Sequence, residues 1–315
     1  MEFLTAIFVT PFSEIASSPV FFAEVVISGM LTGVLYSMVA LGFVLIFKAS
    51  GIFNYAQGAM VLFAALTLVG LIEHGAPVWL AMILTVVIMV CMAFVVERFM
   101  LRPLVNQDLI ILFMATIGLN FVLEGLGQIV WGSNVKALDI GIPEHPFEIN
   151  IGAEYILLST FDVYAALIGA VMVISLSVFF HMTTIGRALR AVADDHQAAM
   201  SVGIPLRTIW IIVWSVAGMV GLVAGIMWGS KTGVQFSLTL IALKALPVLI
   251  LGGFTSIPGA IIGGLIIGVG EKVAEVYWGP AVGGAIENWF AYILALGFLL
   301  IRPQGLFGDK IIERV

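Results

Sequence analysis

The sequence predicts an all-α membrane protein, a polytopic bundle of about nine hydrophobic helical spans, with eight as the alternative count. Hydrophobic residues make up 62% of the 315 residues and charged residues only 10%, whereas about a quarter of a soluble chain is charged. The apolar stretches are about 20 residues long, enough to cross about 30 Å of hydrocarbon as a helix. They lack the alternation of a membrane β-barrel, which argues against that class.

Each apolar stretch predicts one span. Gly51 and Asn54 interrupt the second span, and Lys244 and Pro247 interrupt the seventh. No stretch reads as a linker, so residues 1–315 are predicted to form a single transmembrane domain. The predicted spans are 21–47, 52–72, 77–97, 109–131, 161–181, 208–229, 238–254, 258–278 and 286–302.

Small residues recur at four-residue spacing in two of the later spans. Gly221, Gly225 and Gly229 share one helix face, and Gly264 and Gly268 share another. Faces of this kind allow helix backbones to approach closely in a membrane. The spacing therefore predicts tight helix–helix packing.

Basic residues predict the orientation, because cytoplasmic loops carry an excess of Lys and Arg. If the loop after the first span is cytoplasmic, the opposite side receives only Lys136, Lys231 and Lys272, and its loop 132–160 is acidic. The sequence thus predicts a bacterial inner-membrane protein with an external N-terminus and a cytoplasmic C-terminus. The cytoplasmic basic residues are Lys48, Arg98, Arg102, Arg187, Arg190, Arg207, Arg302, Lys310 and Arg314.

Several classes of function lack support in the sequence. There is no basic tract for nucleic acid, no metal-spaced Cys/His cluster and no catalytic serine or HExxH motif. We therefore expect no enzyme activity, no metal and no bound cofactor. The Gly-x-x-x-x-Gly-Lys-Ser/Thr loop is also missing, so any ATP is expected to be used by partner subunits. Cys91, the only cysteine, is predicted to be a buried small hydrophobe.

Polar residues at membrane depth are the candidates for function. Thr116, Asn120 and Glu124 follow one another at four-residue spacing and so share one helix face, and Lys244 lies within the seventh span. Glu124 and Lys244 are interpreted either as an ion pair that fixes helix register or as separate contacts to a pathway.

Two further polar residues follow the break at Gly51. Asn54 and Gln57 lie at the start of the second span. They are interpreted either as hydrogen-bond partners for backbone exposed by the break or as residues that line a pathway.

The loop between the fifth and sixth spans predicts a short helix. Residues 187–200 are rich in alanine, which favours helix, and Gly203 and Pro205 follow as stop signals. A helix of small residues on the cytoplasmic face either docks into a groove of a partner or is a solvated connector.

Six segments, in this order, resemble the permease family of branched-chain amino acid ABC importers, the LivH/LivM type, and the LivH half more closely. The resemblance covers most of the chain. The segments are GVLYSMVALGFVLIFKASGIFNYAQG (33–58), ERFMLRPL (97–104), ATIGLNFVLE (115–124), GRALRAVADDHQAAMSVGI (186–204), ALKALPVLILGGFTSIPGAIIGGLIIG (242–268) and RPQGLFG (302–308).

The resemblance implies an ABC importer with two permease subunits, two ABC ATPase subunits, an external substrate-binding protein and surrounding membrane lipid. Its cargo is expected to be a branched-chain or other hydrophobic amino acid. Urea or short amides are the alternative cargo, and a self-sufficient secondary transporter or channel is the alternative class. Segment 186–204 is expected to be the coupling helix, with the coupling residues Gly186, Arg187, Arg190, Ala191, Ala198 and Gly203.

Overall fold

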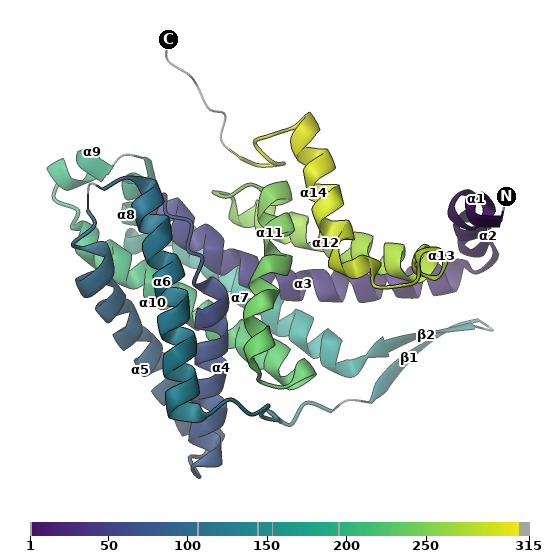
Figure 1. Cartoon of the computed structure of the whole chain (residues 1–315), viewed down its shortest axis with the longest axis horizontal. Helices are drawn as coiled ribbons and strands as arrows, with labels where there is room; N and C mark the ends of the chain where they lie inside the picture. The colour runs from purple at the N-terminus through teal and green to yellow at the C-terminus, as the bar shows by residue number, and fades with distance from the viewer. Residues whose placement is uncertain (1, 106, 144, 153, 195, 309–315) are drawn as a thin grey trace.

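A computed structural model describes residues 2–105, 107–143, 145–152, 154–194 and 196–308, and helices dominate it (Figure 1). In chain order the elements are α1 Glu2–Phe8, α2 Thr10–Ser17, α3 Pro19–Ser50, α4 Gln57–Glu73, α5 Val78–Val96, the π-helix η1 Glu97–Leu101, α6 Leu109–Trp131, β1 Pro146–Ile151, β2 Glu154–Ser159, α7 Thr160–Met182, α8 Thr184–Asp194, α9 His196–Ser201, α10 Leu206–Thr232, the 3-10 helix η2 Phe236–Leu240, α11 Ile241–Gly252, α12 Ile257–Tyr277, α13 Gly279–Val282, the 3-10 helix η3 Ile286–Asn288 and α14 Phe290–Ile301.

The predicted all-α membrane bundle is confirmed, and each predicted apolar stretch forms a helix. Within the described ranges, six helices are long and apolar enough to cross a membrane: α3, α5 with η1, α6, α7, α10 and α12. Three apolar helices are shorter, namely α4, η2 with α11, and α14. The protein is therefore membrane-embedded.

Burial separates the interior helices from the peripheral ones. In the most apolar window of each helix, 78% of residues are buried in α3 and 72% in α10, against 22% in α6 and 28% in α5. The exposed faces of α5 and α6 are apolar, so they are suited to contact with lipid rather than with water. The helices α3 and α10 therefore form the centre of the fold.

The crossing of α3 and α12 is built from glycine. A Cβ atom on Gly29 of α3 would lie 2.7 Å from the Cα atom of Val269, and Gly33 packs in the same way against Gly264. Backbones at this distance leave no room for a side chain, and such crossings gain van der Waals contact over the whole interface. The predicted close packing at Gly264 and Gly268 is confirmed.

Loops gather at two opposite ends of the bundle. At one, here called the α8 end, the rings of Phe47 and Phe254 are 5.4 Å apart and the Leu306 amide donates to the Leu251 carbonyl. At the other, the hairpin end, Lys136 pairs with Glu73 of α4. The α8 end carries Lys48, Arg98, Arg102, Arg187, Arg190, Arg207 and Arg302, while Lys310 and Arg314 lie outside the described residues.

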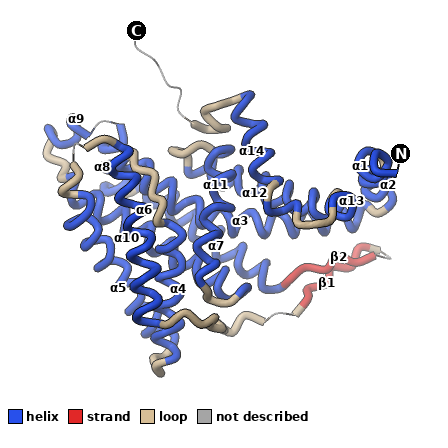
Figure 2. The backbone as a smooth tube through the Cα atoms, in the orientation of Figure 1, coloured by secondary structure: helices blue, strands red, loops and turns tan. Residues whose placement is uncertain are grey.

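A two-stranded hairpin, which the sequence analysis did not predict, stands in the acidic loop 132–160 (Figure 2). β1 and β2 are antiparallel, with Pro146 opposite Ser159 and Ile151 opposite Glu154. The Glu24 carboxylate at the start of α3 accepts a hydrogen bond from the Leu157 amide at 2.8 Å. The hairpin is thereby tied to the first long helix.

The buried face of α5 corrects the prediction for Cys91, which is exposed. Residues of α5 that point inward repeat at four-residue spacing, and Cys91 falls between them on the outer face. An apolar run alone does not tell the core side of a membrane helix from its lipid side, because both are apolar. The inward residues are Ala81, Thr85, Met89, Ala93 and Val96.

The predicted helix 187–200 is two helices, α8 and α9, and α8 begins earlier, at Thr184. Residue 195 between them lies outside the described residues. The predicted stop is confirmed: Gly203 has φ of +87°, and the Ile204 amide donates to the Ala199 carbonyl at 3.0 Å. A positive φ suits glycine at a helix end.

Candidate functional site

Segment 51–56 returns from the end of α3 into the bundle without forming helix. Gly51 ends α3 with φ of +68°. Asn54 accepts a hydrogen bond from the Ala56 amide at 3.2 Å, and Thr116 of α6 accepts one from the Tyr55 amide at 3.0 Å. Irregular backbone at membrane depth must find partners within the protein. These side chains supply them, and Thr116 holds the segment against the first half of α6.

A second irregular segment, 233–240, enters from the hairpin end. Val234 and Lys136 exchange backbone hydrogen bonds of 2.8 and 3.0 Å, and η2 follows. The second segment packs against Gly58 in the first turn of α4, where a Cβ atom would lie 3.1 Å from the Thr239 carbonyl carbon. Thus α4 and α11 both begin inside the bundle, and they run to opposite ends.

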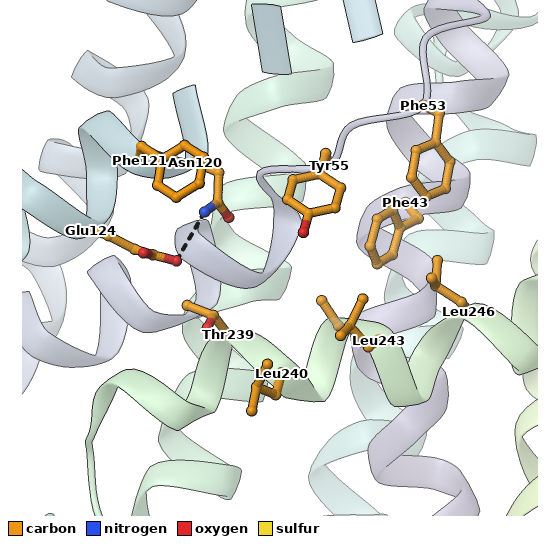
Figure 3. Close-up of a pocket in the computed structure, with 11 residues that line it drawn as sticks. Phe43, Phe53, Tyr55, Asn120, Phe121, Glu124, Thr239, Leu240, Leu243 and Leu246 are labelled. Carbon is orange, nitrogen blue, oxygen red and sulfur yellow. Dashed lines mark hydrogen bonds between the residues drawn. The ribbon is translucent and has the colours of Figure 1, made fainter. Parts of the chain in front are cut away.

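A cavity of about 180 Å³ lies where the two segments meet (Figure 3). Its walls come from α3, the irregular segment 51–56, α6, η2 and α11, and they are mainly aromatic and leucine side chains. It is smaller than the roughly 300–1,000 Å³ of drug-sized sites, and so suits a small molecule. The lining residues are Phe43, Phe53, Tyr55, Asn120, Phe121, Glu124, Thr239, Leu240, Ala242, Leu243 and Leu246.

The predicted polar face of α6 is present, and its residues divide between two tasks. Thr116 donates to the Phe113 carbonyl at 2.8 Å and supports the backbone at Tyr55. Asn120 and Glu124 line the cavity, and the Asn120 amide donates to the Glu124 carboxylate at 2.9 Å. No three His, Cys, Asp or Glu side chains come together as metal ligands in the part of the chain that the structure describes.

The cavity is open on one side and closed on another. Phe121 and Leu240, on its rim between α6 and α11, are 66% and 58% exposed, so this side faces out of the bundle. Toward the α8 end, the ring of Phe53 stacks on Phe43 at 5.2 Å and meets Phe254 at 6.2 Å. These aromatic side chains fill the space between the cavity and that end.

Glu124 and Lys244 do not pair with each other, which corrects the ion-pair interpretation. The Lys244 ammonium lies 3.9 Å from the Glu287 carboxylate, while the partner of Glu124 is Asn120. Leu243 and Leu246 of α11 face the cavity. Successive helical residues are about 100° apart, so Lys244 points instead toward Glu287 of η3.

Asn54 and Gln57 are fully buried, and neither lines the cavity. The Asn54 amide lies 3.4 Å from the Gln57 carbonyl oxygen, and the Gln57 amide nitrogen has no hydrogen-bond partner among the described residues. A Cβ atom on Gly42 would lie 2.5 Å from the Gln57 amide carbon. Glycine at 42 therefore gives the Gln57 side chain its place against α3.

The expected coupling residues lie on α8, on α9 and just after α9. Gly186 is buried, and a Cβ atom there would lie 2.6 Å from the Phe179 carbonyl oxygen. Arg190 donates to the Phe180 carbonyl, which anchors α8 to the end of α7. Arg187 and Ala198 are exposed and Ala191 is half-buried. Exposed Gly203 follows α9.

Glu97 is a buried carboxylate that the sequence analysis did not single out. It is 2% exposed and lies in the π-helix η1, with Arg102 Nε at 3.4 Å and Arg207 Nε at 3.7 Å. The Arg207 guanidinium also lies 5.6 Å above the Phe94 ring. Glu97 thus joins α5 to the start of α10, directly after α9. The signal was present as an acidic residue at a predicted span end, followed by the basic residues Arg98 and Arg102.

Glu271 of α12 is a second buried carboxylate that was missed. It is 3% exposed and lies close to Tyr36 of α3, and its Oε1 atom has no hydrogen-bond partner in the described ranges. Tyr36 in turn stacks on Trp228 of α10 at 5.6 Å. The signal that drew attention to Glu124, a charge inside a predicted span, applies equally to Glu271.

Comparison with known proteins gives a consistent set of similarities. Residues 25–302 match the model of the family described as "Branched-chain amino acid transport system / permease component". The high-affinity branched-chain amino acid transport permease LivH of Salmonella typhimurium is 26% identical over 94% of this chain and 98% of its own length. BraD of Pseudomonas aeruginosa is 26% identical over 93% and 98%. The fructose import permease FruG of Bifidobacterium longum is 22% identical over 83% and 78%.

Proposed function

Because the chain belongs to the branched-chain amino acid transport permease family, we propose that it is the transmembrane permease subunit of a binding-protein-dependent ABC importer. The observation that carries this proposal is the cavity at the meeting point of two interrupted helices. In many secondary transporters the cargo site lies near mid-membrane where helices are discontinuous, and we propose the same placement here. The chain holds no phosphate-binding loop motif, so separate ATPase subunits use the ATP.

The translocation pathway passes the cavity and is completed by a second permease subunit. Two observations support this. The rim residues Phe121 and Leu240 leave the cavity open between α6 and α11, so a subunit that covers this face closes it. The aromatic side chains around Phe53 close it toward the α8 end. The partner is a second copy of this chain or a related permease.

The cargo is a branched-chain or other hydrophobic amino acid. LivH and BraD, whose names specify branched-chain amino acids, match almost the whole chain, and the cavity walls are mainly apolar. FruG carries fructose in its name and matches as well. Similarity to these permeases therefore does not fix the cargo by itself, and the residues of the cavity must decide it. Urea or a short amide is the competing assignment.

Two ATPase subunits dock at the α8 end through α8 and α9. The inward residues Leu189 and Val192 are buried, so α8 is held firmly in the bundle, while Arg187 and Ala198 face outward. A small-residue surface fits a groove on a partner, and a rigid helix pair passes a displacement on to the bundle. The basic residues at this end make it the cytoplasmic side, and an external substrate-binding protein docks at the hairpin end.

Bulky residues on the outward face of α9 test the docking proposal. We expect Ala198→Trp to leave membrane insertion intact and to weaken ATPase co-purification, because overpacking a fitted contact costs about 1–3 kcal/mol. Two further variants are expected to uncouple ATP hydrolysis from transport. Ala191→Trp enlarges a half-buried residue of α8, and Gly203→Val places a β-branched residue at φ of +87° after α9.

The matched control is Val135→Trp, an exposed position, 63% accessible, beside Lys136 at the hairpin end. It should retain wild-type ATPase binding. Wild-type association and coupling in all three α8–α9 region variants would show that these helices are only a connector, and the ABC importer proposal would lose its mechanical basis.

A further inference from the structure

Glu124 is a carboxylate at membrane depth without a counter-charge. Its hydrogen bond comes from the neutral Asn120 amide, and no Lys, Arg or His forms an ion pair with it among the residues that the structure describes. A charge within a membrane helix is costly and usually marks a functional site. An incoming positive charge would satisfy it.

Other polar groups on the cavity wall also present acceptors. Because the Asn120 amide nitrogen faces the carboxylate, its carbonyl oxygen is left to accept a hydrogen bond. The Thr239 hydroxyl donates to the Phe236 carbonyl at 2.9 Å, so the lone pairs of the Thr239 oxygen remain able to accept a hydrogen bond. Tyr55 reaches in from the irregular segment 51–56, with its hydroxyl directed toward Leu243 (Figure 3). This hydroxyl is a donor as well as an acceptor.

The remaining walls are apolar and aromatic. Leu240 at the end of η2 and Leu243 and Leu246 of α11 form a leucine surface. The rings of Phe43 and Phe53 stand opposite the α6 side chains (Figure 3). Aromatic faces attract ammonium groups as well as apolar groups. The cavity therefore joins one negative charge to a surface that accepts a small branched hydrocarbon chain.

The geometry points to this cavity as a cargo subsite for a small apolar amino acid, in which Glu124 takes the ammonium group, Tyr55 donates to the carboxylate and the leucines of α11 hold the side chain. The inference rests on the proposed transport function and deepens it by naming the groups that read the cargo. No lining residue is cationic, so a molecule with only a carboxylate finds an unpaired negative charge beside its own. Neutral urea leaves Glu124 without a counter-charge.

Direct binding to the complete transporter, purified in lipid nanodiscs without the binding protein, separates these ligands. The probes are radiolabelled leucine, 3-methylbutylamine, 4-methylpentanoate and urea. We expect saturable binding of leucine and of the amine, and none of the acid or urea. Glu124→Gln should weaken the binding of both at least tenfold, Glu124→Asp should weaken it less, and Tyr55→Phe should weaken leucine more than the amine.

Glu148→Gln, which removes an exposed carboxylate from β1, is the matched control and should bind as wild type. Leu246→Trp fills the cavity from α11 without replacing Glu124 and should abolish binding of both ligands, which keeps the test decisive if Glu124→Gln does not fold. Unchanged leucine binding in Glu124→Gln or Leu246→Trp, or equal binding of urea, would overturn the assignment. Failure of the ABC importer proposal appears separately, as wild-type protein that neither retains an ATPase nor takes up leucine on addition of ATP.

Discussion

The joint at Glu97 allows a quantitative prediction, because one buried carboxylate serves two arginines. Arg102 and Arg207 approach its two oxygens at 3.4 and 3.7 Å. Arg207 is the second residue of α10, so the joint fixes the helix that follows α9. We expect the joint to be needed both for stability and for passing a displacement of α8 and α9 to α5.

The size of the effect follows from burial. Unit charges about 4 Å apart interact by about 4 kcal/mol at an effective dielectric constant of about 20. The arginine side chains are 38% and 49% exposed, so screening and the desolvation of Glu97 offset most of this. We expect Glu97→Gln to lower the free energy of unfolding by about 1–2 kcal/mol. Replacing both arginines by Gln should cost more, roughly 3 kcal/mol, because it leaves a buried carboxylate without a partner.

The assay is the thermal midpoint of each purified variant in mild detergent at one fixed heating rate, since such unfolding is commonly irreversible. Arg98→Gln, an exposed neighbour on the same turn, is the control and should leave the midpoint unchanged. The order wild type, Glu97→Gln, double arginine variant is the predicted order of decreasing midpoint. A double arginine variant as stable as wild type, or more stable than Glu97→Gln, would refute the reasoning.

Two further predictions concern topology and the Lys244 pair. In a Cys91→Ala background, which removes the exposed native thiol, cysteines at Lys136 and Arg190 should react with an impermeant thiol reagent from opposite sides of spheroplasts; labelling of both from outside would contradict the orientation. This partly exposed pair is expected to stabilise the fold by up to about 1 kcal/mol. Exchanging the charges of Lys244 and Glu287 should therefore recover more monodisperse protein than either single reversal. A double variant no better than the singles would show that the pair does not stabilise the fold.

Much of the fold could be predicted from one-dimensional patterns. Apolar length gives the spans, and the spacing of Thr116, Asn120 and Glu124 gives a shared helix face, because both depend only on local helix geometry. The break after Gly51 could also be predicted locally, because glycine readily adopts the positive φ that ends a helix. The first residues of α4 and α14 could not be predicted, because packing against other helices decides where these helices begin.

The rest depends on which helices become neighbours. The cavity brings Tyr55 from the first interrupted segment next to Thr239 from the second, and no local signal joins residues so far apart in the chain. Glu287 was not predicted as the partner of Lys244, because no local pattern joins residues of different helices. Cys91 was misassigned because lipid and core select the same residue types.

The central claim, that this chain is the permease of an ATP-driven importer, is tested most directly by leucine uptake in sealed proteoliposomes. The complete transporter is reconstituted with ATP inside and the binding protein outside. The account predicts that leucine accumulates only when ATP and binding protein are both present, and that Ala198→Trp reduces accumulation per ATP hydrolysed. Accumulation driven by an ion gradient in liposomes that contain this chain without an ATPase would contradict it and establish a self-sufficient transporter instead.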